Sequence, residues 1–296
     1  MASIPSNPAR DSGFAPPPEE VGAMYDETGE LLEMVQGRTA LHVGMFVPPG
    51  NTKPLAGLPD LIDAAQDRQT DYLIGATELA ADGHLLDIGC GTGGPAVRLA
   101  RSSGGRVTGI TVSKTQVDRC RERALAAGLT GRVAFQYGDA MAMGFPDATF
   151  DAAWAVDCLC HMRDRAAALA EAYRVLKPGG PLLLTEFTLR GTPPEEQLAA
   201  FTRMWSSGVP RTLPEVLGEV HEAGFRTSEV LDLTSNMRVS GELMGVIFED
   251  RRAEIEERFG AEATERAGVL MEPFRAFCQG HLEYHLWKLR KPEAPA

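Results

Sequence analysis

Cysteine is scarce in this chain, and the few cysteines form no metal-binding or disulfide pattern. There are five, an odd number, and no two are spaced as a CxxC pair: Cys90, Cys120, Cys158, Cys160 and Cys278. An odd count argues against a disulfide framework, and the absence of CxxC pairs argues against a zinc cluster. We therefore expect no metal centre and a reduced, cytoplasmic protein.

Basic residues and long apolar runs are scarce as well. Lys and Arg total 29 against 41 Asp and Glu, so the net charge is −12. An acidic chain repels phosphate backbones, which disfavours a nucleic-acid partner. No apolar run reaches the roughly 18 residues of a membrane span, and the N-terminus lacks an apolar signal core. These absences predict a small-molecule partner rather than nucleic acid or membrane. A locally basic pocket for a diphosphate substrate stays open.

Composition and hydrophobic spacing divide the chain into three parts. Residues 1–18 are rich in Pro, Ser and Gly, which predicts a disordered tail. Residues 19–81 have helical spacing on both sides of a Gly/Pro-rich loop at 44–59, which predicts an N-terminal helical cap. Residues 82–296 form the predicted core, with a helical lid insertion at about 237–280 before the last strand.

From residue 84 onward, short apolar strands alternate with helical patterns. Glycine and proline end the helices, and Ser113 precedes one of them as a cap. This alternation predicts a parallel, doubly wound α/β sheet. The predicted strands are 84–89, 106–112, 132–138, 150–156, 181–188, 226–233 and 281–289, and the predicted helices of the core are 94–101, 114–127, 163–176, 195–205, 213–223 and the stretch 241–277.

A glycine-rich turn, DIGCGTGG at 87–94, follows the first of these strands. Glycines let the backbone approach a ligand closely, but the GxGxxG spacing also fits a dinucleotide site or a turn without a ligand. The carboxylate of Asp87 suits a positively charged ligand, such as S-adenosylmethionine (SAM) with its ammonium and sulfonium groups. The second strand ends in TVS at 111–113 rather than in the acid that binds the ribose of NAD. Both observations favour SAM over a dinucleotide.

Four segments, in order, resemble the motifs of class I SAM-dependent methyltransferases. They read LLDIGCGTGGPAVRLA, VTGITVSKTQV, YGDAMAMGFPDATFDAAWAVDCLCHM and RVLKPGG, within residues 84–189. The chain is most similar to the small-molecule, natural-product subgroup, which includes the rebeccamycin sugar O-methyltransferase and, more distantly, geranyl diphosphate C-methyltransferases. Residues 41–44 (LHVG) resemble a short motif of this subgroup. The resemblance implies a Rossmann-like, seven-stranded sheet of order 3-2-1-4-5-7-6 with an antiparallel last strand.

The resemblance also implies how SAM is held. Residues 89–91 would line its methionine part, and Asp139 would reach the adenine amino group. The pair 111–112 and Gln116 would face the ribose, where most class I members instead carry an acid. Tyr25 would cover the methionine end, or else only pack within its helix. The predicted cofactor contacts are Tyr25, Asp87, Gly89, Cys90, Gly91, Thr111, Val112, Gln116, Asp139, Ala140, Met141 and Val156.

Three titratable residues, His161, Glu186 and Asp157, follow or end the fourth and fifth strands, where ligands of open α/β sheets bind. His161 matches the histidine assigned as base in the sugar O-methyltransferase, or else caps a helix. Glu186 would orient His161 or accept the proton, or instead form an ion pair. Asp157 matches the glutamate that removes a proton in C-methylation of isoprenoid diphosphates, or else binds substrate or the ammonium of SAM. All three are predicted catalytic residues.

Methylation of a hydroxyl group of a secondary metabolite, with His161 as base, is the leading hypothesis. C-methylation of an alkene or prenyl diphosphate is the alternative, with Asp157 as base and phosphate held by Arg38, Arg203, Arg211 or Arg238. A SAM-binding regulator without catalysis is the second alternative. His281 and His285 lack a third ligand, so no metal site is predicted. The acceptor and the oligomeric state stay open, a homodimer included.

Overall fold

The computed structural model describes residues 16–36, 40–45 and 61–293. The predicted tail, up to residue 15, and most of the predicted loop at 44–59 lie outside the described residues. The first helix begins at Pro18, one residue earlier than predicted.

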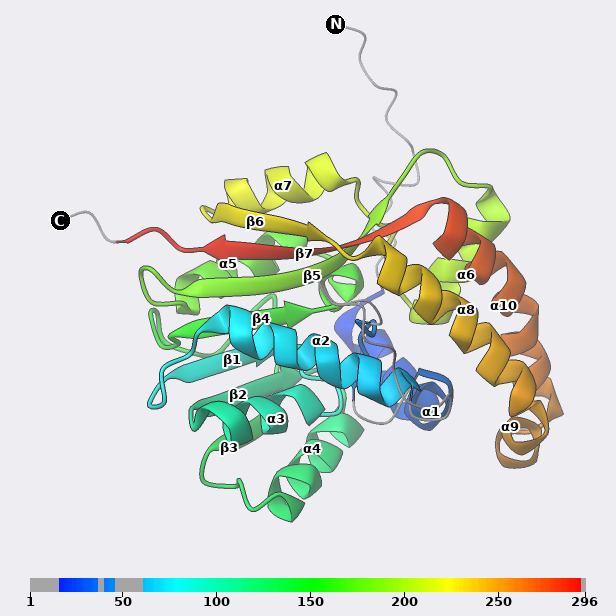
Figure 1. The fold of residues 1–296 in the computed structure, drawn as a ribbon, viewed down its shortest axis with the longest axis horizontal. Coiled ribbons are helices and arrows are strands. Elements are labelled where there is room, and N and C mark those ends of the chain that lie inside the picture. The colour runs from blue at the N-terminus through cyan, green and yellow to red at the C-terminus, as the bar shows by residue number, and fades with distance from the viewer. Residues whose placement is uncertain (1–15, 37–39, 46–60, 294–296) are drawn as a thin grey trace, which may run out of the picture.

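Seven strands form one sheet at the centre of the molecule (Figure 1). Their order is β3-β2-β1-β4-β5-β7-β6, and β7 runs antiparallel to both of its neighbours, which confirms the predicted topology. The central strands β1 and β4 are almost continuously apolar because helices cover both faces of the sheet there. The strands are β1 His84–Ile88, β2 Arg106–Thr111, β3 Val133–Tyr137, β4 Ala152–Val156, β5 Pro181–Leu189, β6 Arg226–Asp232 and β7 Leu282–Arg290.

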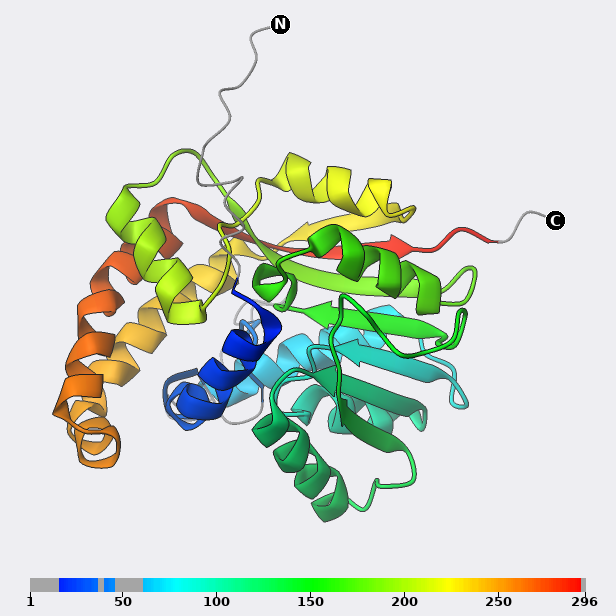
Figure 2. The same cartoon turned by 180° about the vertical axis from the view of Figure 1, so that it is seen from behind.

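Helices cover both faces of the sheet and gather at one of its ends. Helices α2 and α3 lie on the face seen in Figure 1, and α5 and α7 lie on the face seen in Figure 2. Helices α1, α6, α8, α9 and α10 lie toward the carboxyl ends of the parallel strands. The helices are α1 Pro18–Gln36, α2 Leu61–Thr77, α3 Gly94–Ser103, α4 Lys114–Ala126, α5 Arg165–Val175, α6 Glu195–Trp205, α7 Leu213–Glu222, α8 Thr234–Asp250, α9 Arg252–Phe259 and α10 Ala261–Gly280.

The helical insertion between β6 and β7 starts earlier than predicted. Helix α8 begins at Thr234 instead of residue 241, and Asp232 Oδ1 accepts the Thr234 N–H at 2.8 Å, which satisfies one of the free N–H groups of the first turn. Helix α10 packs against α6 as well as against α8, so α6 belongs to the same helical cover. The division into cap, core and lid stays a prediction.

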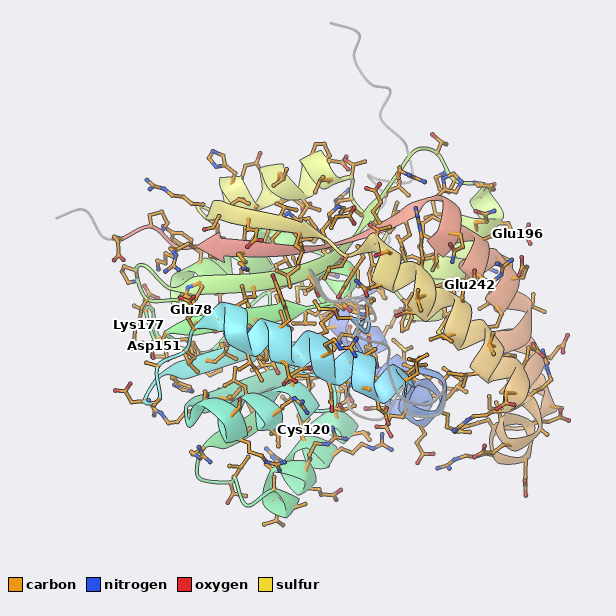
Figure 3. The ribbon with its side chains drawn as sticks, in the orientation of Figure 1. Glu78, Cys120, Asp151, Lys177, Glu196 and Glu242 are labelled. Carbon is orange, nitrogen blue, oxygen red and sulfur yellow. The ribbon has the colours of Figure 1, made fainter. Side chains whose placement is uncertain are left out.

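A charged pair lies at the amino-terminal ends of the central parallel strands. Lys177 Nζ lies 2.6 Å from Asp151 Oδ1, and the other oxygen of Asp151 accepts the His84 N–H at 2.9 Å (Figure 3). The hydrogen bond between Asp151 and His84 links the starts of β1 and β4, at the end of the sheet opposite to the carboxyl ends of these strands. Within the described ranges, no helix combines the length and the apolar character that crossing a bilayer requires.

Candidate active site

A cavity lies at the carboxyl ends of β1, β2, β3 and β4. It encloses about 980 Å³ of empty space, counting the part that is open to solvent. All the predicted cofactor residues line it, and so do Asp157 and His161. Because these residues come from helix α1, from the start of α4 and from four strand ends, the fold brings together groups that are far apart in the sequence.

The glycine-rich turn forms one wall of the cavity and leaves its backbone uncovered. Gly89 has a φ of +69°, and a Cβ at this position would lie 2.6 Å from the Cβ of Cys158. Gly91 has a φ of +51°. Both conformations favour glycine, and the first position also lacks room for any side chain. Beneath the turn, Cys120 on α4 donates from Sγ to the carbonyl oxygen of Gly91 at 3.2 Å (Figure 3).

Asp87 places an unsatisfied carboxylate oxygen in this wall. The residue is 4% exposed, and among the described groups its Oδ2 has no hydrogen-bond partner. Burial raises the pKa of Asp87 to about 7. A buried carboxylate without a partner is costly, so a cationic ligand at this oxygen would remove an unfavourable interaction.

The far end of the cavity offers hydrogen-bonding groups of a different kind. Thr111 Oγ1 donates to Gln116 Oε1 at 2.7 Å, so the amide nitrogen of Gln116 stays available as a donor. Ser113 caps α4 as predicted, because its Oγ accepts the Gln116 N–H at 3.1 Å. Asp139 Oδ1 accepts the Met141 N–H at 2.8 Å, which leaves the second oxygen for a ligand's donor. A donor and an acceptor at this end suit a ribose and an amino-substituted base.

Helix α1 closes the cavity from above. A Cβ on Gly22 would clash with the carbonyl oxygen of Val112, so α1 lies directly on the end of β2. Asp26 accepts hydrogen bonds from Ser113 Oγ and, at 3.3 Å, from the Thr115 N–H. This docking turns Val21 and Tyr25, which are one helical turn apart, toward the cavity.

His161 lies at the mouth of the cavity, in a single 3₁₀ turn, Leu159–His161, that follows β4. Its Nδ1 lies 3.3 Å from the carbonyl oxygen of Ser206, which can only accept, so Nδ1 carries the proton. Its Nε2 therefore accepts from the hydroxyl of Tyr25 at 3.0 Å. Burial lowers the pKa of His161 to about 4. The imidazole is therefore neutral near pH 7, and its lone pair faces Tyr25.

Asp157 has a φ of +52°, and both of its carboxylate oxygens are engaged. Oδ1 accepts from Thr185 Oγ1 at 2.5 Å, and Oδ2 accepts the Val43 N–H at 3.0 Å. Burial raises its pKa. Asp157 thus lines the cavity, but its hydrogen bonds go to the protein.

Glu186 does not reach His161, which corrects the prediction that it orients the base. Its side chain is 1% exposed and lies 2.7 Å from Nη1 of Arg165, which also binds Glu219 at 2.8 Å. Glu186 is absent from the described lining of the cavity. The group that orients His161 is the Ser206 carbonyl, and the ion-pair alternative describes Glu186.

Comparison with known proteins assigns the family. A methyltransferase-domain family matches residues 86–184. The 27-O-demethylrifamycin SV methyltransferase of Amycolatopsis mediterranei is 37% identical over 282 residues, which cover 94% of this chain and 99% of that one. The O-methyltransferase resE of Aspergillus sclerotiorum is 35% identical over 75% of this chain and 82% of its own. This chain belongs to the SAM-dependent methyltransferases.

Solved structures of other proteins share the fold of this methyltransferase. The [4+2]-cyclase SpnF superposes with a TM-score of 0.80 at 31% identity, over 95% of this chain and 98% of that chain. The geranyl diphosphate C-methyltransferase of Streptomyces coelicolor has a TM-score of 0.69 at 19% identity, over 94% of this chain and 99% of that chain, which shows the fold alone.

SAM is the cofactor of the methyltransferase, and the cavity fits it. The unpaired oxygen of Asp87 suits its ammonium, the amide of Gln116 suits its ribose, and the glycine turn admits a ligand against the backbone. When bound, SAM supplies an activated methyl group. The contacts of individual residues with SAM remain predictions.

Some lining residues were missed by the sequence reasoning. They are Pro18, Val21, Ala40, Leu41, His42, Thr92, Pro95, Ile110, Gly138, Cys158 and Met162. The LHVG motif signalled two of them, and the helical spacing of 18, 21 and 25 signalled two more. Thr92 lies within the glycine-rich turn, and Ile110, Gly138, Cys158 and Met162 adjoin predicted site residues. Ala40 and Pro95 have no such signal.

Three of the other candidates named from the sequence, Arg211, His281 and His285, have structural partners. Arg211 lies 3.3 Å from Glu219, and Arg38 is outside the described residues. His281 and His285 contact the Arg190 carbonyl and the Thr188 hydroxyl. Among the described residues, no three candidate ligands gather around a metal position.

Proposed function

We propose that the methyltransferase transfers the methyl group of SAM to a hydroxyl group of a bulky natural product, with His161 as general base. The observation that carries this proposal is the neutral imidazole at the mouth of the cavity, whose Nδ1 is held by Ser206 and whose Nε2 is an acceptor. The names of two relatives support oxygen as the methylated atom. One is an O-methyltransferase, and the other is named for 27-O-demethylrifamycin SV.

The chemistry needs alignment and one proton acceptor. The hydroxyl oxygen of the acceptor bonds to the methyl carbon while the carbon–sulfur bond breaks, which leaves S-adenosylhomocysteine. The hydroxyl proton goes to Nε2 of His161. A hydroxyl is a weak nucleophile at neutral pH, so a base within hydrogen-bonding distance lowers the barrier. The Ser206 carbonyl keeps the proton on Nδ1 and thereby keeps Nε2 free to accept.

Tyr25 occupies the position that the acceptor hydroxyl must take. Its hydroxyl donates to Nε2 of His161 at 3.0 Å, so acceptor binding has to displace this hydrogen bond. Burial lowers the pKa of His161 to about 4, so the imidazole stays neutral at pH values well below 7. Nε2 of His161 therefore offers a free lone pair to the acceptor hydroxyl once Tyr25 moves aside.

The arrangement of Asp157 favours oxygen over carbon as the site of methylation. The C-methylation alternative requires this acid to take a proton from the acceptor. Both of its oxygens instead accept hydrogen bonds from Thr185 and Val43. Arg211, one of the arginines proposed to hold a diphosphate, is paired with Glu219.

A labelled-methyl assay tests the proposal. The enzyme is incubated with deuteromethyl SAM and a panel of hydroxylated macrocycles, and the labelled position is found by mass spectrometry and NMR. We expect the label on oxygen. His161→Ala should lower the single-turnover rate by about 10²- to 10⁴-fold with unchanged S-adenosylhomocysteine binding. His221→Ala, at an exposed histidine of α7, is the matched control. Label on carbon, or a full rate in His161→Ala, would overturn the proposal.

A further inference from the structure

We propose that Asp157 is a positioning residue that fastens the segment Ala40–Met45 to the sheet and so shapes the cofactor cavity. The inference rests on the proposed function in one respect, namely that proton acceptance belongs to His161. It assigns to Asp157 a role different from both roles predicted for it, proton transfer and direct contact with ligand.

The carboxylate of Asp157 is at the centre of a closed set of hydrogen bonds. Thr185 on β5 donates to Oδ1 at 2.5 Å, and its oxygen accepts the backbone N–H of Asp157 at 3.0 Å. Tyr284 on β7 also interacts with this carboxylate, and its hydroxyl accepts from Gln69 at 2.9 Å. The end of β4 and side chains from β5 and β7 therefore converge on one buried acid.

The remaining oxygen of Asp157 holds the segment 40–45. Its partner is the Val43 N–H at 3.0 Å, and Ala40, Leu41 and His42 line the cofactor cavity. A segment that lines a binding site must be fixed in position to give the site a defined shape. The hydrogen bond between Asp157 and Val43 joins this segment to the stretch of chain after β4 that also carries His161.

Helix α2 holds the other side of the same segment. Gln66 bridges it with two hydrogen bonds, since its Oε1 accepts the Ala40 N–H at 3.2 Å and its Nε2 donates to the His42 carbonyl at 3.1 Å. The imidazole of His42 meets Thr70 Oγ1 at 3.1 Å, and the Met45 N–H donates to Ala65 at 2.9 Å. The segment is thus fixed between α2 and the Asp157 carboxylate.

The donors explain why an acid is needed here and why it is a poor base for the acceptor. Three donors meet this carboxylate, namely the hydroxyls of Thr185 and Tyr284 and the Val43 N–H. Each hydroxyl already accepts a hydrogen bond, from the Asp157 N–H or from Gln69, and has its own proton left to donate. An amide nitrogen facing these hydroxyls would leave such a proton without its acceptor, whereas a carboxylate accepts it. A proton taken up by either oxygen would oppose one of these donors. The acid therefore acts through Val43 on the cavity rather than on the acceptor.

The decisive variant is Asp157→Asn, which keeps the shape and turns one end of the carboxylate into a donor. We expect S-adenosylhomocysteine to bind about 10- to 100-fold more weakly by calorimetry, the loss typical of a hydrogen bond to a charged group. The Val43 amide should exchange with deuterium faster than in the wild type. At saturating SAM, the single-turnover rate should stay within about tenfold of the wild type, because His161 is intact.

His161→Ala and Asp118→Asn complete the comparison. His161→Ala should lose turnover and keep both the binding constant and the protection of Val43. Asp118→Asn, at an exposed acid of α4 that pairs with Arg121, should change neither. An Asp157→Asn enzyme that binds S-adenosylhomocysteine normally, protects Val43 and yet fails to transfer methyl would overturn the inference, because it would make Asp157 the proton acceptor.

Thr185→Val keeps the inference testable if Asp157→Asn fails to fold. It retains the carboxylate and removes one of its donors, so we expect the same two changes with a smaller loss of binding, about 2- to 10-fold. Unchanged binding and unchanged Val43 exchange in this variant would contradict the inference. Neither readout involves an acceptor, so a failure of the proposed O-methylation leaves both interpretable.

Discussion

The unpaired oxygen of Asp87 leads to a quantitative prediction for cofactor binding. Without ligand, burial places the pKa of this acid at about 7. A bound ammonium favours the ionised form, so binding releases a proton wherever the free enzyme still carries it. The affinity should therefore rise with pH up to about 7 and level off above it. For a pKa of 7 that falls well below 6 on binding, the dissociation constant at pH 6 is about tenfold weaker than at pH 8.

Calorimetry with S-adenosylhomocysteine tests this prediction at the two pH values. Buffers of different ionisation enthalpy should report the release of nearly one proton at pH 6 and little at pH 8. The pKa of His161, at about 4, is outside this range. Burial also raises the pKa of Asp157, so Asp87→Asn is needed to isolate the contribution of Asp87. This variant should lose most of the pH dependence and bind about 10- to 100-fold more weakly at pH 8. Equal affinities at both pH values in the wild type would refute the placement of the ammonium at Asp87.

Four further predictions concern the groups around this site. Tyr25→Phe keeps the ring but removes the hydrogen bond that competes for His161, so the KM for the acceptor should fall about 2- to 10-fold in steady-state assays. Gly22→Ala should push α1 off β2 and weaken S-adenosylhomocysteine binding, which calorimetry and limited proteolysis would detect. Arg165→Met leaves the buried Glu186 without its cation, and urea unfolding should show a loss of about 3–5 kcal/mol. At saturating SAM, kcat should decline only as the pH falls toward about 4, where His161 becomes protonated.

Much of the fold was predictable because the spacing of apolar residues along the chain indicates most of its helices and strands. Helix α6 was predicted at its observed bounds, and the strands differ from the prediction by a residue or two at their ends. The 3₁₀ turn Leu159–His161 is too short to show a period, and it was missed. The early start of α8 was missed as well. The strand order came from the family resemblance, and the structure confirms it.

The residues of the candidate site were predictable where they follow strand ends. The prediction failed where the role of a residue depends on the direction of its side chain. Every residue expected to contact the cofactor lines the cavity. Asp87 and the glycine turn are marked locally in the sequence, and the other contacts came from the family resemblance. Glu186 was placed at the site because it lies near the end of β5. Neighbouring strand residues point to opposite faces, so Thr185 turns toward Asp157 while Glu186 turns toward Arg165. That alternation was visible in the sequence, but the buried cation that receives Glu186 was not.

The cavity explains how a shared fold can host different reactions. The cyclase SpnF has a similar fold at 31% identity, so the sheet alone does not determine the chemistry. In this methyltransferase, two helices outside the sheet supply the groups that contact the imidazole proposed as the base. Tyr25 reaches Nε2 of His161 from α1, and Ser206, held at a φ of +44°, reaches Nδ1 from the end of α6. A change in either contact alters the position or the hydrogen bonding of the same imidazole. On the proposed mechanism, the acceptor atom is therefore selected where Tyr25 and Ser206 contact His161, and the strand ends would hold the cofactor.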